Sequence, residues 1–166
     1  MIGARGGLKP LLRLMRKMRF QNDFDAYATV IQFVSRRALR LGGYRPLVLY
    51  GPMGCGKTRM STTIRKVLGI TDPGRSMFWN GAASVRELDH VLMPHCMAVV
   101  LRDVSGNVQS FRDWLFYRQE KWLATDLIIE TSDFRTFSSL GRMEFCDSVV
   151  FDGLPTDARK GGRYDD

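Results

Sequence analysis

The spacing of apolar residues over the first 41 positions predicts two helices. Residues 8–20 place apolar side chains at helical spacing with basic residues between them, which is typical of a short basic amphipathic helix. Residues 22–41 repeat apolar positions at i, i+3, i+4 and i+7, with Asn22 or Asp23 as the N-cap and Gly42-Gly43 as the end. The apolar positions are Leu11, Leu12, Met15 and Met18 in the first helix, and Phe24, Tyr27, Ala28, Ile31, Val34, Ala38 and Leu41 in the second. We therefore expect a helical N-terminal segment over residues 1–43.

From residue 47 onward, short apolar runs of strand type alternate with helical spacing. Strands are predicted at residues 47–50, 76–79, 96–101, 126–131 and 147–151. Helices are predicted at residues 56–68 and 111–123, and a capping box at 84–87 opens a further short helix. Such alternation predicts an α/β fold in which helices flank both faces of a five-stranded, mostly parallel sheet. This domain would span residues 44–153, and the polar tail 154–166 is expected to be disordered.

The strongest motif is GPMGCGKT at residues 51–58, which matches G-x-x-x-x-G-K-[ST] between a predicted strand and a predicted helix. Its glycines let backbone amides curl around phosphate groups, and the following helix points its positive N-terminus at the same place. Lys57 adds charge for the terminal phosphates, and Thr58 offers a hydroxyl to Mg²⁺. The residues predicted to bind ATP or another NTP are Gly51, Pro52, Met53, Gly54, Cys55, Gly56, Lys57, Thr58 and Arg59.

Hydrolysis needs an acidic group as well, for Mg²⁺ and for aligning the attacking water. Asp103 follows the strand 96–101, at the end where doubly wound sheets bind their ligands. We predict that Asp103 binds the metal together with Thr58; the alternative is an N-cap for a following helix. Because Arg102 and Val104 flank it, the acid stands alone, and weak turnover is compatible with that.

Polar residues also follow the strand 126–131, where Asp133 is predicted to help hold the attacking water. The alternative is a helix cap by Ser132 or Asp133. Arg142, or less favourably Arg135, is a candidate arginine finger toward the γ-phosphate of a neighbouring subunit, against the alternative of a solvated surface position. The predicted catalytic residues are Lys57, Asp103, Asp133 and Arg142.

The net charge of +8 comes entirely from residues 1–45. These hold ten Lys or Arg and two acidic residues, whereas the other 121 residues hold 15 basic and 15 acidic side chains and balance. A basic N-terminal segment of this kind favours a polyanionic partner, and we expect single-stranded nucleic acid rather than an anionic membrane. The alternative is a basic helix face that only meets water.

Cysteine usage and hydropathy bear on the compartment. Cys55, Cys96 and Cys146 are odd in number and form no CxxC pair, which predicts a reducing, intracellular compartment. No apolar run approaches the ~20 residues of a transmembrane helix. The Arg-rich, acid-free first 20 residues leave an organelle transit peptide as an alternative.

Three stretches together resemble the superfamily 3 helicase domain, most closely that of the replication initiators of small circular single-stranded DNA viruses. VLYGPMGCGKTRM resembles its phosphate loop, VVLRDVSGNVQSFRDWL its metal-binding strand, loop and helix, and LIIETSD its γ-phosphate-sensing motif. The resemblance covers residues 44–151 and implies an AAA+-like P-loop NTPase with a five-stranded parallel sheet. It further implies a homo-oligomeric ring on single-stranded DNA that serves viral replication or packaging, in the nucleus or cytoplasm of a host cell.

The chain departs from that family at several positions. Arg102 stands where the family has the first of two acids, with Asp103 in the place of the second, and Asp133 replaces the family's Asn. The two histidines, His90 and His95, form no His-x-His site, so we do not expect the family's nicking endonuclease within these residues. Two other functions therefore stay open: a non-catalytic, nucleotide-dependent scaffold, and a small nucleotide or metabolite kinase.

Overall fold

The computed structural model describes residues 7–39, 45–69, 76–80, 98–102, 109, 112–113, 115, 126–140 and 146–155. The helices are α1 (Lys9–Met15), α2 (Asp23–Leu39), α3 (Lys57–Val67) and α6 (Phe134–Leu140). The strands are β1 (Leu47–Tyr50), β2 (Ser76–Asn80), β3 (Ala98–Arg102), β4 (Asp126–Thr131) and β5 (Asp147–Val150). The helix predicted at 84–87, most of that at 111–123 and the tail from residue 156 lie outside the described residues.

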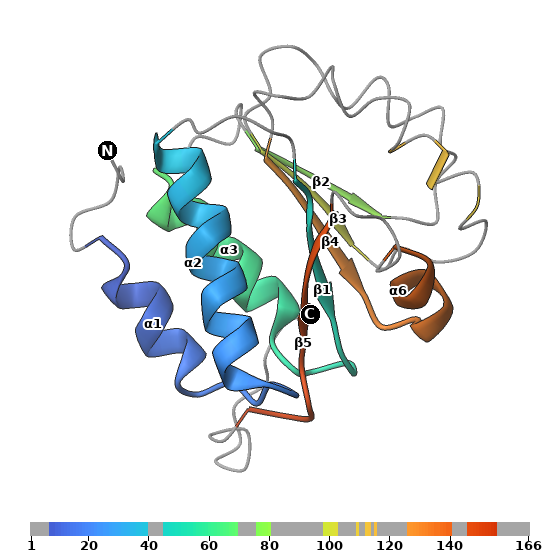
Figure 1. Ribbon diagram of the computed structural model, residues 1–166, viewed down its shortest axis with the longest axis horizontal. Coiled ribbons are helices and arrows are strands. Elements are labelled where there is room, and N and C mark those ends of the chain that lie inside the picture. The colour runs from blue at the N-terminus through green and yellow to red at the C-terminus, as the bar shows by residue number, and fades with distance from the viewer. Residues whose placement is uncertain are drawn as a thin grey trace.

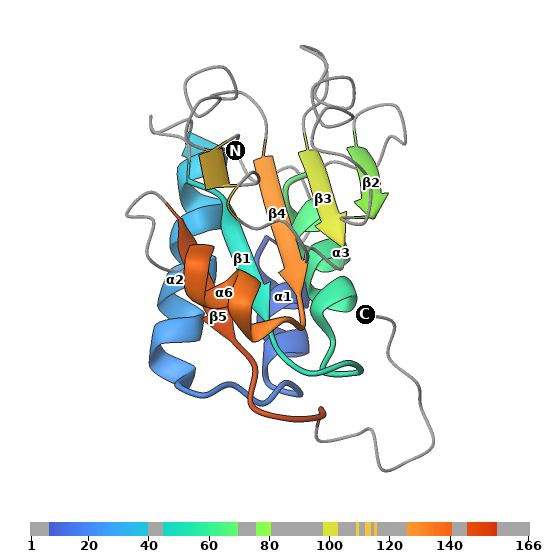
Figure 2. The same cartoon turned by 90° about the vertical axis from the view of Figure 1, so that its right-hand side faces the viewer.

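The strands form one sheet in the order β2-β3-β4-β1-β5, and each described pairing is parallel (Figure 2). The parallel sheet expected from the alternating pattern is therefore confirmed. β4 lies between β1, which leads into the phosphate loop, and β3, which leads to Asp103. Because the strands are parallel, the carboxyl ends of β1, β4 and β3 meet at one edge, where such sheets bind ligands.

Helices cover both faces of the sheet (Figure 1). α1, α2 and α3 lie on one face, and α6 lies on the other, near β1 and β4. The ring of Phe137 in α6 stacks on that of Tyr50 in β1, with centroids 4.3 Å apart and planes 8° from parallel. Burial on both faces explains why β1 reads as the continuous apolar run LVLY.

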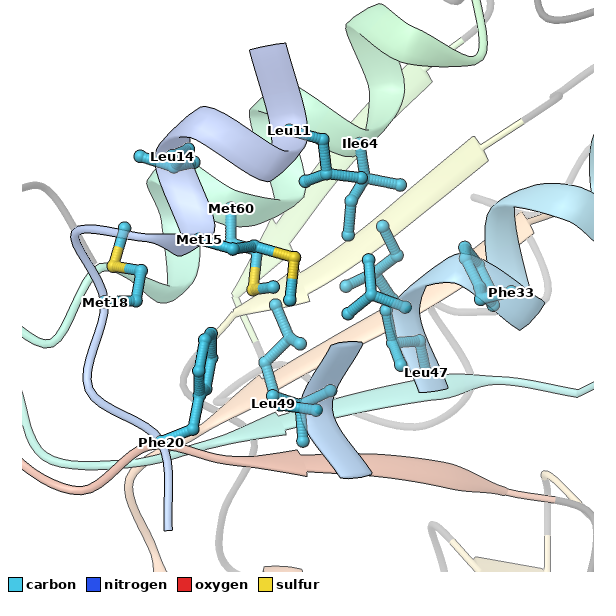
Figure 3. Packing of buried hydrophobic residues seen from close by; sticks show 14 of the residues in the cluster. Leu11, Leu14, Met15, Met18, Phe20, Phe33, Leu47, Leu49, Met60 and Ile64 are labelled. Atoms are coloured by element: carbon cyan, nitrogen blue, oxygen red, sulfur yellow. The ribbon is translucent and has the colours of Figure 1, made fainter. Parts of the chain in front are cut away.

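The N-terminal helices share one hydrophobic core with the strand and helix that flank the phosphate loop (Figure 3). Leu11 and Met15 of α1 point toward Met60 and Ile64 of α3, above Leu49 of β1. All five side chains are at most 1% exposed. α1 therefore presents its apolar side to α3, and its basic residues Lys9, Arg13 and Arg16 stay exposed to solvent.

Both N-terminal helices differ in detail from the predicted apolar faces. α1 ends at Met15, and Leu14 rather than Leu12 is buried with Leu11. Over residues 23–36 of α2, whose burial is described, the buried apolar residues are Ala26, Val30, Phe33 and Val34, whereas Phe24 is 81% exposed. These buried residues form a second apolar stripe on α2. This stripe packs against β5 and the hydrophobic core. Its predicted cap is confirmed, since Asn22 Oδ1 accepts a hydrogen bond from the Asp25 amide at 3.0 Å.

The segment between α1 and α2 runs antiparallel to the end of β5. Gln21 donates its amide proton to the Val150 carbonyl at 2.9 Å, and Asp152 donates to the Arg19 carbonyl at 2.7 Å. Between them, the rings of Phe20 and Phe151 lie with centroids 5.1 Å apart. This pairing fixes the N-terminal segment beside the phosphate loop.

Among the described helices, none is both long and apolar enough to cross a membrane.

A bidentate ion pair joins Arg45, two residues before β1, to Asp147 at the start of β5. Arg45 donates from Nε and Nη2 to the Asp147 carboxylate, with Nη2 2.7 Å from Oδ1, and this hydrogen bonding raises the pKa of Arg45. Both side chains are partly shielded from water, so we expect Arg45→Ala to lower the free energy of unfolding by about 1 kcal/mol. Urea denaturation measures this. The exposed Arg13→Ala is the control, and an equal loss in that control would show that the ion pair contributes nothing specific.

Candidate nucleotide site

Gly51 begins the phosphate loop in a position too crowded for any side chain. A Cβ at Gly51 would lie 2.6 Å from the Cβ of Phe151 and 2.8 Å from the Sγ of Cys55. The Gly51 amide also donates to the carbonyl of Thr131, the last residue of β4, at 3.3 Å. The start of the loop is therefore held against both β4 and the residue that follows β5.

Gly56 closes the loop and forms the N-cap of α3. Its φ of +102° lies in the left-handed region, which residues with a Cβ rarely adopt. A Cβ there would also lie 2.7 Å from the Cε of Met18, which comes from the segment after α1. The turn lets α3 begin at Lys57 with its positive N-terminus facing the loop.

Lys57 is folded back onto the loop and is only 2% exposed. Its Nζ donates to the carbonyls of Gly51 at 2.9 Å and Pro52 at 3.0 Å, and lies 3.6 Å from the Sγ of Cys55. The ammonium group thus holds the loop in a curled shape. The same group is within the loop's concavity, where a phosphate would take over part of its hydrogen bonding.

Thr58 contacts an acid that the motif does not contain. Its hydroxyl donates to Oε1 of Glu130 at 2.8 Å, and Glu130 belongs to β4. Glu130 is 2% exposed, so its carboxylate is buried next to the phosphate loop. This bond links the first turn of α3 to the central strand of the sheet.

Asp133 caps α6. Its Oδ1 accepts from the Arg135 amide at 3.2 Å and its Oδ2 from the Thr136 hydroxyl at 2.8 Å. The hydrogen bond from Thr136 is the main reason that the pKa of Asp133 is lowered. The helix cap, which is the alternative role for Asp133, is therefore present, and the carboxylate is hydrogen-bonded to α6. Its role toward the attacking water stays a prediction.

The other predicted site residues are placed as follows. Pro52, Met53 and Arg59 are exposed, Met53 to 80%, whereas Cys55 is fully buried beneath the loop. Arg135 is exposed on α6. Asp103 and Arg142 lie outside the described residues, although β3 ends at Arg102, immediately before Asp103, and pairs with β4.

Glu130 is the residue that the sequence interpretation missed, although a signal for it exists. It is a carboxyl group inside the otherwise apolar run DLIIET, and alternation along a strand places it on the same face as Ile128. Ile128 belongs to the core beneath α3, so that face is the buried one. A charged residue on a buried strand face requires a polar partner, and here that partner is Thr58.

The residues present fit a nucleotide with Mg²⁺. The loop offers a curled backbone, a buried ammonium group and a helix N-terminus for phosphates. Mg²⁺ prefers oxygen ligands and is usually held by one or two carboxylates together with phosphates, and Thr58 and Glu130 supply such oxygens side by side. Within the described part of the chain, no group of three or more His, Cys, Asp or Glu residues is placed to hold a metal ion.

No protein-family model matches the sequence, and neither does any curated protein. Solved structures do match. A point variant of Thermotoga maritima RuvB has 11% identity and a TM-score of 0.53, covering 81% of this chain and 48% of RuvB. Caenorhabditis elegans PCH-2 has 14% identity and a TM-score of 0.53, covering 90% of this chain and 47% of PCH-2. This chain thus spans about half the length of each. At these identities the likeness shows the fold alone, an α/β fold similar to that of RuvB and PCH-2.

Proposed function

We propose that this chain is a P-loop NTPase that binds ATP with Mg²⁺ and hydrolyses it. The observation that supports this best is the phosphate loop in its full setting, with buried Lys57 at its centre and Thr58 beside a carboxylate. Lys57 would hold the terminal phosphates, and Thr58 would bind the metal, which supplies charge neutralisation when bound. Asp103, and Asp133 at the end of β4, would complete the acidic side of the site.

We further propose that the NTPase acts on single-stranded nucleic acid. The support is the exposed basic face of α1, where Lys9, Arg13 and Arg16 follow one another at i, i+4 and i+7 while the apolar side is buried against α3. The segment that follows α1 also lies close to the phosphate loop, because Met18 is next to Gly56. On the resemblance of its three motifs, the proposal extends to helicase-like work in viral replication or packaging.

The basic face of α1 predicts a steep salt dependence. Neutralising three phosphate contacts contributes about −2 to the slope of log K against log salt for single strands. We expect the triple variant of Lys9, Arg13 and Arg16 to alanine to flatten that slope by about 2. Fluorescence anisotropy with a labelled oligonucleotide measures it. Melting temperature should be unchanged, since all three side chains are exposed. An unchanged slope would remove α1 from the interface.

We also propose that the chain works as a homo-oligomeric ring in which Arg142 or Arg135 reaches the γ-phosphate on a neighbouring subunit. Mixing experiments test this role. Doping wild-type protein with an inactive arginine-to-alanine variant should lower ATP turnover more steeply than in proportion to the variant's share. A strictly proportional fall would mean that each subunit acts alone, as the kinase alternative requires.

A further inference from the structure

Glu130 occupies a distinctive place in the sheet. It is the penultimate residue of β4, the strand between β1 and β3, and it is 2% exposed. The carbonyl of its neighbour Thr131 accepts a hydrogen bond from the Gly51 amide at 3.3 Å. This end of β4 therefore makes two hydrogen bonds to the phosphate-loop motif, one through Thr131 and one through Glu130. The carboxylate is therefore carried by a rigid strand, not by a surface loop.

The direction of the Thr58–Glu130 bond determines what the hydroxyl can do. A threonine hydroxyl has one proton and two lone pairs. In this structure the Thr58 hydroxyl donates its one proton to Glu130 Oε1, at 2.8 Å. Both lone pairs of the Thr58 oxygen then remain available to a cation at the mouth of the loop. An amide or apolar residue at 130 would hold the hydroxyl less firmly and would remove a negative charge from beside it.

We propose that Glu130 is a positioning residue for the Mg²⁺ of the bound nucleotide. It orients the Thr58 hydroxyl with its lone pairs toward the metal, and it adds a negative charge that favours the divalent cation. β4 would thus supply a carboxylate to the metal side of the site in addition to Asp103 on the chain after β3. This inference rests on the proposed nucleotide binding, and it predicts that the benefit of Mg²⁺ for binding depends on residue 130.

The test compares the affinity for a fluorescent, non-hydrolysable ATP analogue with Mg²⁺ and with EDTA. For wild-type protein, Mg²⁺ should tighten binding. In Glu130→Gln, which keeps the size of the side chain, affinity with Mg²⁺ should fall about tenfold, as is usual when a residue that orients a metal ligand is changed. Affinity in EDTA should stay equal or improve, because a negative charge near the triphosphate has been removed. A purely structural role would weaken binding in both conditions.

Two further variants make the test specific. Thr58→Val removes the hydroxyl, and adding Glu130→Gln to it should cause a smaller loss with Mg²⁺ than Glu130→Gln causes alone, because only the charge of Glu130 is then left to lose. Asp25→Asn, an exposed acid on α2, should behave as wild type. If Glu130→Gln responds to Mg²⁺ like wild type, or loses affinity equally in EDTA, the inference is wrong although the proposed function stands. If the wild type binds no analogue, or Lys57→Ala binds it as well as wild type, both fall.

Discussion

Lys57→Ala is expected to weaken ATP binding about 10- to 100-fold, the range that corresponds to losing one charge-assisted hydrogen-bonding group. Lys57 is the buried cation at the centre of the loop, with its Nζ 2.9 Å from the Gly51 carbonyl. Its removal takes away the positive charge that the terminal phosphates would meet. It also leaves the carbonyls of Gly51 and Pro52 without that ammonium group, so the loop itself becomes less well defined.

Equilibrium titration with a fluorescent ATP analogue measures this loss. The matched control is Lys66→Ala, because Lys66 lies on the same helix, α3, but is exposed in its last turn. That variant should bind ATP as wild type does. Equal affinities for wild type and Lys57→Ala would mean that the loop does not bind the phosphates, whatever its sequence.

Gly51→Ala should have the largest effect on stability of the substitutions considered. The added methyl would lie 2.6 Å from the Cβ of Phe151 and 2.8 Å from the Sγ of Cys55, and a Cβ cannot move away by a simple rotamer change. We expect a loss of about 3 kcal/mol, at the upper end for overpacked sites. For a domain of this size that corresponds to a fall in melting temperature of roughly 6–12 °C.

Gly7→Ala separates crowding from backbone strain. Gly7 has a φ of +58°, and an added Cβ would meet nothing within 4 Å. Its cost should be about 1 kcal/mol, from the left-handed backbone alone. Thermal unfolding followed by circular dichroism compares the two variants. If Gly51→Ala melted within about a degree of Gly7→Ala, the close contact between the loop and Phe151 would not exist in solution.

The sequence was sufficient to predict the parts of the fold that depend on local pattern. The runs LVLY and LIIET are strands whose successive residues are almost all buried, so both faces are covered. The glycine-rich stretch lies between β1 and α3, as its motif requires. The cap at Asn22 was also predictable, because it depends only on residues three apart. The bounds of α3, Lys57–Val67, are likewise within one residue of the predicted helix 56–68.

Features that depend on tertiary contacts could not be read from the sequence. Helix α2 carries two overlapping apolar stripes, and only its packing leaves Phe24 exposed and buries Val30 and Phe33. The bond between Thr58 and Glu130 joins residues 72 positions apart, which no local spacing reveals. Two contacts of the loop also depend on distant pairings. Phe151 lies beside Gly51 because β5 pairs with β1, and Met18 lies beside Gly56 while residues 19–21 pair with the end of β5.

ATP turnover with and without single-stranded DNA, measured on wild type beside Lys57→Ala, tests the proposed function most directly. The account predicts that wild-type protein releases phosphate, that single-stranded DNA increases the rate, and that Lys57→Ala reduces it to background in both conditions. Turnover that is equal in wild type and Lys57→Ala, or absent from a wild type that binds ATP, would contradict it. The second of these results would leave a nucleotide-binding scaffold as the better description of the chain.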